Sequence, residues 1–148
     1  MKSALLNDAD GLRTFVVVLS TDDEVMATLQ RFVLEQRLKA SQFSAIGAFS
    51  RVVVAFFDWK TKAYRHLPID EQVEVLSLLG DVTLDVDKQK IHAHVVVGKS
   101  DGTAHGGHLI EAHVRPTLEV MVTELPRHLH RKFDRTSGLT LIEPHLSR

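Results

Sequence analysis

The sequence predicts a single α+β domain, residues 1–148, in which one main helix near the N-terminus accompanies a largely antiparallel β-sheet. Three observations predict this fold. One early segment has apolar residues at helical spacing, and many segments of alternating or β-branched apolar residues follow it. The length suits one domain. No linker, internal repeat or low-complexity segment divides the chain.

The main helix is expected over residues 23–38. Thr21 and Glu24 have the spacing of a capping box, and Asp22 and Asp23 suit the positive end of a helix dipole. The apolar residues that follow recur at helical spacing and are expected to face the core: Val25, Met26, Leu29, Phe32 and Val33.

Strands account for most of the remaining chain. They are expected over residues 14–20, 45–59, 64–68, 71–79, 82–87 and 117–125, with an edge strand possible in the lead-in 1–13. In the segment 71–79, alternation puts Val73 and Val75 on one face and Leu76 and Leu78 on the other. Gly80 and Asp81 are expected to end that strand. Pro116 is expected to precede the last one, whose β-branched residues favour a strand over a helix.

A histidine-rich segment, residues 91–113, carries the main functional signal. His92 and His94 lie two residues apart in a predicted strand, so both side chains project from the same face. A turn at residues 100–102 and the flexible pair Gly106 and Gly107 would let a returning strand bring His108 to them. Three converging imidazoles match a three-histidine metal site with an open position.

The alternative is that these histidines are only hydrogen-bonded strand residues. His105 and His113 lie nearby but outside the motif, and we expect them to matter less. Three carboxylates are candidate bases that spacing does not rank: Glu111, Glu119 and Glu124.

Composition limits the classes of function. The chain has no cysteine, so a metal would depend on nitrogen and oxygen ligands. The net charge of −1 provides no overall basic field for nucleic acid and no polybasic tail for a membrane. The basic residues in segment 127–135 are typical of a solvated face. No signal-peptide core is found near the N-terminus, so a cytoplasmic location is expected.

Four segments together resemble the plant-and-prokaryote-conserved (PPC) domain family, in its prokaryotic branch without an AT-hook. They are SAIGAFSRVVVAFFD (44–58), EVLSLLGDVT (74–83), HAHVVVGKSDGTAHGGHL (92–109) and VRPTLEVMVTEL (114–125). The resemblance covers roughly residues 12–143 of the chain. It implies a curved, largely antiparallel sheet and assembly as a homotrimer.

The resemblance also implies a divalent metal, commonly zinc, bound by His92, His94 and His108. Glu119 matches a recurrent family position, where it would be a further metal ligand or would contact one of the metal ligands. The alternative is that Glu119 is a surface carboxylate on a strand. Plant members of the family carry an Arg-Gly-Arg-Pro hook for the minor groove of DNA. This chain has no Arg-Gly-Arg, so DNA binding is expected to be weak or absent.

Two functional hypotheses remain open at this stage. The first is a trimeric metal-binding domain whose open coordination position serves a small anionic ligand or a hydrolase- or lyase-type reaction. The second is a DNA-associated regulator in which the histidines are structural. A cupin-like oxygenase is disfavoured, because residues 95–99 lack the glutamate that normally follows its H-x-H motif. Whether the protein is an enzyme stays open.

Overall fold

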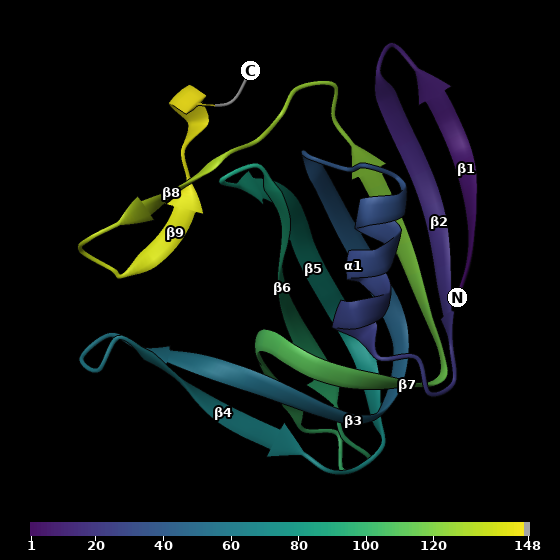
Figure 1. Ribbon diagram of the computed structural model, residues 1–148. Helices are drawn as coiled ribbons and strands as arrows, with labels where there is room; N and C mark the ends of the chain where they lie inside the picture. Colours follow the sequence, from purple (N-terminus) through teal and green to yellow (C-terminus); the bar gives the residue numbers. More distant parts are fainter. Residues whose placement is uncertain (147–148) are drawn as a thin grey trace.

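A computed structural model describes residues 1–146 as a seven-stranded, entirely antiparallel sheet with one α-helix packed on its inner face (Figure 1). The elements are β1 (Lys2–Ala9), β2 (Leu12–Ser20), α1 (Val25–Glu35), β3 (Ser41–Asp58), β4 (Ala63–Ile69), β5 (Val73–Asp85), β6 (Lys88–Gly98), β7 (Ala104–Glu124), β8 (Arg131–Asp134), β9 (Leu139–Ile142) and the 3₁₀ turn η1 (Pro144–Leu146). The predicted α+β fold is confirmed. A separate two-stranded hairpin, β8–β9, follows the sheet.

The sheet is strongly curved because β7 pairs with three other strands. Its second half lies between β2 and β3, and its first half pairs with β6 and again with β3. The pairings β3–β5, β5–β6, β6–β7 and β7–β3 therefore form a closed path. Curvature of this kind encloses a core on the side of the sheet where α1 packs (Figure 1).

The helix α1 is shorter than expected, and its N-cap differs from the predicted one. Glu24 is itself the N-cap, because its carboxylate accepts hydrogen bonds from the backbone N–H groups of Met26 and Ala27. The predicted capping box is wrong, since the Thr21 hydroxyl donates instead to the carbonyl of Pro116. At the other end, Arg37 has a φ of 55°, which ends the helical path. At 11 residues, α1 is the longest helix in residues 1–146 and falls short of spanning a membrane.

Two expected strand breaks are absent. β5 continues through Gly80, where a Cβ atom would lie 2.2 Å from the ring of Phe43 and 2.7 Å from the carbonyl oxygen of His92. This glycine provides room for close packing rather than a turn. β7 continues through Pro116, which lies between the register positions 114 and 118 at a gap in the ladder with β3. A proline without an N–H group is tolerated there because no ladder bond is lost.

Alternation in β5 reverses at a bulge. The register with β6 shifts between Val75 and Ser77, so Leu78 is buried together with Val75, whereas Leu76 points outward. The prediction that Leu76 and Leu78 share a face is therefore wrong. The shift also turns Leu79 outward, next to His94 on β6.

The core lies between α1 and the inner face of the sheet. Phe32 of the helix packs edge-on against Phe15 of β2, with ring centroids 5.4 Å apart. From β6, the core takes Ile91, Ala93 and Val95, in strict alternation. The residues between them therefore face outward, and these include the first two histidines of the candidate site.

Candidate metal centre

His92 and His94 occupy adjacent outward positions on β6. Their inward neighbours Ile91, Ala93 and Val95 are buried in the core, which fixes the register of the strand and hence the direction of both imidazoles. Core packing on one face thus orients the candidate ligands on the other, as strand alternation predicts.

His108 reaches the same place from β7 because two glycines precede it. A Cβ on Gly106 would lie 2.7 Å from the carbonyl oxygen of Val95 in β6, and one on Gly107 would lie 2.7 Å from that of Ala55 in β3. Only residues without a side chain let β7 pass so closely between these strands. In the resulting register, His108 lies directly opposite His94.

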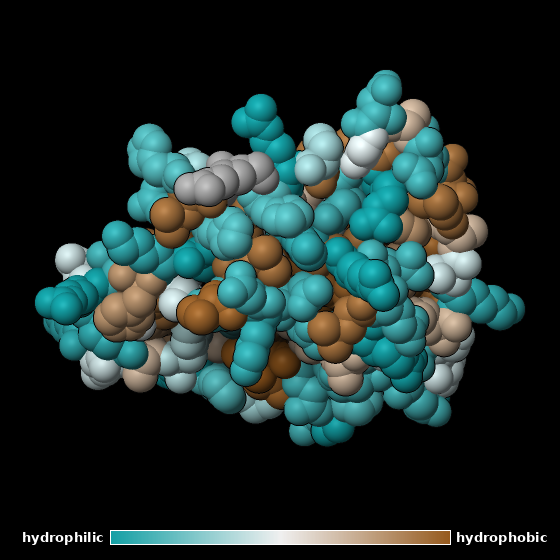
Figure 2. All heavy atoms as spheres, turned by 45° about the horizontal axis from the view of Figure 1, so that its top comes forward, coloured by the Kyte–Doolittle hydropathy of each residue, from teal (hydrophilic) through white to brown (hydrophobic). Residues whose placement is uncertain are grey.

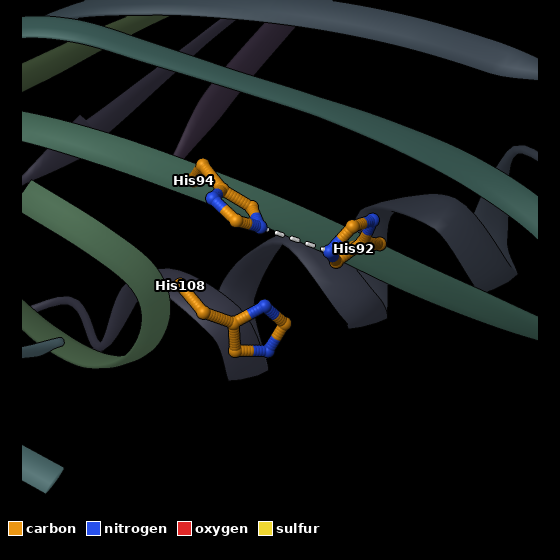
Figure 3. Close-up of side chains that lie close together, drawn as sticks. All are labelled: His92, His94 and His108. Atoms are coloured by element: carbon orange, nitrogen blue, oxygen red, sulfur yellow. Dashed lines mark hydrogen bonds between the residues drawn. The ribbon is translucent and has the colours of Figure 1, made fainter. Parts of the chain in front are cut away.

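The three imidazoles converge on one point (Figure 3). The Nε2 atoms of His92 and His94 are 3.1 Å apart, and one nitrogen from each of the three rings lies within 4.8 Å of the others. In Figure 3, Nδ1 of His108, the nitrogen bonded to the ring carbon that carries Cβ, faces the other two rings. Two nitrogens bound to one zinc ion at about 2.0–2.1 Å can be no more than about 4.2 Å apart. The ring nitrogens here lie within 4.8 Å of one another, so small movements of the rings would bring them to bonding distance of one ion.

The chemical state of the site suits a metal. The Nδ1 atom of His108 is buried and has no hydrogen-bond partner in residues 1–146, although a buried polar atom normally has one. Burial, together with the charges of His92, His94 and Lys90, lowers the pKa of His108 to about 4. Burial and the charge of His92 also lower the pKa of His94. Both imidazoles are therefore neutral near pH 7, the form that coordinates metals.

A carboxylate holds the far side of His92. Asp81, opposite His92 in the register of β5 and β6, has Oδ2 3.5 Å from His92 Nδ1. Burial raises the pKa of Asp81, but its contacts with His92 and Arg131 outweigh burial and keep that pKa below its ordinary value. Carboxylates in this position orient metal-bound histidines and fix their tautomer.

Arg131 fixes Asp81 in turn. Its Nη2 donates to Asp81 Oδ1 at 2.6 Å, its Nε donates to the Thr83 hydroxyl at 2.6 Å and its Nη1 donates to the carbonyl of Thr140 at 3.0 Å. The side chain is only 6% exposed. Neither Asp81 nor Arg131 is identified from the sequence, because they lie 11 and 39 residues from His92 and belong to no local motif.

The other candidate residues lie apart from the three imidazoles. Glu119 is exposed on the second half of β7, in register with Val18 and Ile46, and is not among the converging side chains. Glu111 pairs with Arg51 and His113 on another part of the surface. Their positions explain why these carboxylates and His113 do not contribute to the histidine group.

Glu124 and His105 also lie outside the histidine group and interact with other residues. Glu124 is buried and accepts hydrogen bonds from the backbone N–H groups of Lys39 and Ala40 and from the Ser41 hydroxyl, so it holds a loop in place. His105 is exposed and lies 3.3 Å from the Thr103 hydroxyl in the β6–β7 turn.

The metal-free protein is expected to lose stability as the pH falls from about 6.5 to about 4. In the unfolded chain His108 takes up its proton near the ordinary value of 6.5, whereas in the folded protein its pKa is lowered to about 4. The unfolded state therefore binds more protons across this interval, which lowers the free energy of unfolding. Urea unfolding at a series of pH values measures the decrease. His108→Gln should show a shallower decrease, and equal slopes for the two proteins would contradict the assignment.

Comparison with known proteins places the chain among related domains. Residues 7–126 match the Plants and Prokaryotes Conserved (PCC) domain. A segment of 99 residues, 66% of the chain, is 30% identical to the bifunctional protein GlmU of a Synechococcus species. The chain spans only 15% of the length of that protein.

Three solved structures share most of the fold. A metal-containing protein from Archaeoglobus fulgidus is 34% identical, with a TM-score of 0.82 over 88% of this chain and 92% of that one. A candidate DNA-binding protein from Bacteroides thetaiotaomicron is 26% identical, with a TM-score of 0.87 over 95% and 96% of the two chains. A plant- and prokaryote-conserved (PPC) protein from Pyrococcus horikoshii is 25% identical, with a TM-score of 0.83 over 96% and 94%.

Proposed function

Because the chain belongs to the Plants and Prokaryotes Conserved (PCC) domain family, we propose that it is a homotrimeric metal-binding protein with one divalent ion, zinc, at His92, His94 and His108. The observation that carries this proposal is the convergence of three imidazoles around a buried Nδ1 atom that has no partner among the described residues. The similarity to a metal-containing archaeal protein supports it. The expected location is the cytoplasm.

The proposed centre has an open position for a small anionic ligand. Three neutral imidazoles leave the 2+ charge of the ion uncompensated, and such an ion supplies Lewis-acid chemistry when bound. Asp81 holds His92 through its Nδ1 side, and Arg131 holds Asp81. Glu111, Glu119 and Glu124 lie outside the histidine group, so we assign no base and no reaction.

Assembly as a homotrimer is supported by apolar residues on the outer face of the sheet. They come from four strands and include Ile46, Leu76, Leu79, Val96 and Met121. Ile46 is 62% exposed, and Leu79 lies opposite both Ser44 of β3 and His94 of β6. By contrast, the face of the molecule seen in Figure 2 is mostly hydrophilic, with separate apolar patches. An exposed apolar surface across several strands favours contact with another protein surface.

The protein is expected to have a mass in solution of about three times its subunit mass of 16.6 kDa. Light scattering after size-exclusion chromatography measures it at micromolar concentration. Ile46→Glu should dissociate the trimer, because a charge would be buried in the interface. Leu34→Glu is the matched control, since Leu34 is 53% exposed on the helix side of the molecule. A wild-type mass near 16.6 kDa would contradict the proposed assembly.

The second candidate function is a DNA-associated regulator, favoured by the similarity to a candidate DNA-binding protein. Electrostatics argue against tight binding. The net charge is −1, and Arg131 of the basic C-terminal segment is buried against Asp81 rather than available to phosphates. We expect weak binding without sequence preference at physiological salt, measured by fluorescence anisotropy with labelled duplexes. Tight, sequence-selective binding would make the regulator the leading hypothesis.

A further inference from the structure

We propose that the cavity between β4 and the β8–β9 hairpin binds a small organic monocarboxylate, with its carboxylate towards the histidine centre and its apolar body against the hairpin. The inference rests on the proposed metal centre and adds the chemical class of its ligand. Residues 131–142, which form the hairpin, lie beyond the segment 7–126 that matches the family domain.

The cavity adjoins the histidines and has the size of a ligand site. Its volume is about 400 Å³, within the range of typical small-molecule pockets. Residues from five strands and the β8–β9 turn line it: Tyr64, Lys90, Ile91, His92, His108, Arg131, Phe133, Gly138, Leu139, Thr140 and Leu141. A ligand in this space would therefore contact two of the three proposed metal ligands.

Two hairpins enclose the cavity. β3–β4 and β8–β9 project towards the same side of the molecule (Figure 1). Tyr64 of β4 stacks on the ring of His108, with centroids 4.8 Å apart and an angle of 32° between the planes. The pKa of Asp134 on β8 is lowered, chiefly by hydrogen bonds from Ser137, and the charge of Lys62 on the β3–β4 turn contributes.

The β8–β9 wall is fixed to the sheet by several contacts. The N–H group of Leu84 in β5 donates to the carbonyl of Leu129 at 2.8 Å, and Arg131 joins Thr83 to Thr140. Lys90 of β6 donates to the Thr140 hydroxyl at 2.7 Å. A wall held in this way provides a preformed surface, which lowers the entropic cost of binding.

The charges around the cavity favour a single negative charge on the ligand. The Arg131 guanidinium is neutralised by Asp81 at 2.6 Å. The Lys90 ammonium is shared with Asp85 at 3.2 Å and is 45% exposed. The main uncompensated charge would be the ion at the histidines, and a carboxylate suits a hard or borderline cation of this kind.

The body of the ligand is expected to be apolar. Phe133, Leu139 and Leu141 of the hairpin line the cavity, and the Tyr64 ring adds an aromatic plane. Phe133 is 59% exposed, so its ring is accessible to a ligand in the cavity. Arg131 and the Thr140 hydroxyl on this wall are already hydrogen-bonded within the protein, which disfavours sugars and nucleotides. An aryl or branched alkyl carboxylate fits both sides of the cavity.

Calorimetric titration of the zinc-loaded protein with phenylacetate, acetate and 2-phenylethanol tests the proposal. Phenylacetate has both features, whereas acetate lacks the apolar body and 2-phenylethanol lacks the carboxylate. We expect phenylacetate to bind at least about tenfold more tightly than either probe, because acetate lacks the apolar contact of the phenyl group and 2-phenylethanol lacks the charge that the ion attracts. Equal affinity for phenylacetate and acetate would overturn the proposal.

A pair of phenylalanine variants locates the binding. Phe133→Ala should lose the preference for phenylacetate over acetate, and Phe56→Ala should keep it, since Phe56 is equally exposed at 59% but does not line the cavity. Zinc content measured on the same samples shows whether the metal centre or only the cavity assignment fails. If zinc is bound and Phe133→Ala keeps the preference, the cavity assignment is wrong while the metal centre stands. If the wild type binds no zinc, both are wrong.

Discussion

Replacing His94 with alanine is expected to weaken zinc binding more than about 100-fold. The variant loses one of three ligand nitrogens, and even residues that only orient metal ligands contribute about 10–100-fold in affinity. The effect on folding should be small, because His94 projects from the outward side of β6 and its neighbours in the core, Ala93 and Val95, are unchanged. Competition with a chromophoric chelator measures the affinity of protein purified without a histidine tag.

His105→Ala is the matched control for this measurement. His105 lies on β7 three residues before His108, but it is exposed and interacts with Thr103 rather than with the other imidazoles. Its loss should leave zinc affinity within about twofold of the wild type. A His94 variant with wild-type affinity, or equal losses in the two variants, would mean that zinc binds elsewhere or only through loosely placed histidines.

Replacing Glu124 with alanine is expected to lower the free energy of unfolding by about 3 kcal/mol. The carboxylate is 6% exposed and satisfies two backbone N–H groups and the Ser41 hydroxyl. Alanine would leave these donors without a partner in a buried position, each at a cost of about 1 kcal/mol or more. Glu124→Gln keeps one acceptor oxygen and should lose less. Urea unfolding at one fixed protein concentration measures all variants, because the stability of an oligomer depends on concentration.

Glu35→Ala provides the comparison for a carboxylate on the surface. Glu35 is exposed in the last turn of α1, and its replacement should change stability by less than about 0.5 kcal/mol. If Glu124→Ala were no more destabilising than Glu35→Ala, the buried carboxylate would not hold the loop at residues 39–41.

Patterns within one segment of the sequence predict the direction of side chains on a strand and the places where strands approach closely. Alternation in β6 puts His92 and His94 outward, and the glycine pair identifies where β7 approaches its neighbours closely. Long-range packing decides the features that were predicted wrongly. Gly80 is crowded by Phe43, from a strand 37 residues earlier, and therefore continues β5 rather than ending it. The bulge near Val75 depends on the register with β6, which alternation within one segment cannot reveal.

The same limit applies to the candidate site. The histidines are recognisable because their spacing matches strand geometry. Asp81 and Arg131 are not, since they reach His92 only through the pairing of β5 with β6 and through the attachment of β8 to the sheet. Glu119 shows the opposite case: a residue singled out by resemblance lies eleven positions beyond His108 on the same strand, apart from the imidazoles.

The metal-to-subunit ratio of the wild-type protein tests the central claim most directly. Elemental analysis of tag-free protein, purified under zinc-replete conditions and then dialysed, should give one zinc per subunit, because one set of three converging imidazoles is found in residues 1–146. His94→Ala treated in parallel should retain almost none. A wild-type protein without bound metal would contradict the metal centre, and the three histidines would then be hydrogen-bonded residues on the outer face of the sheet.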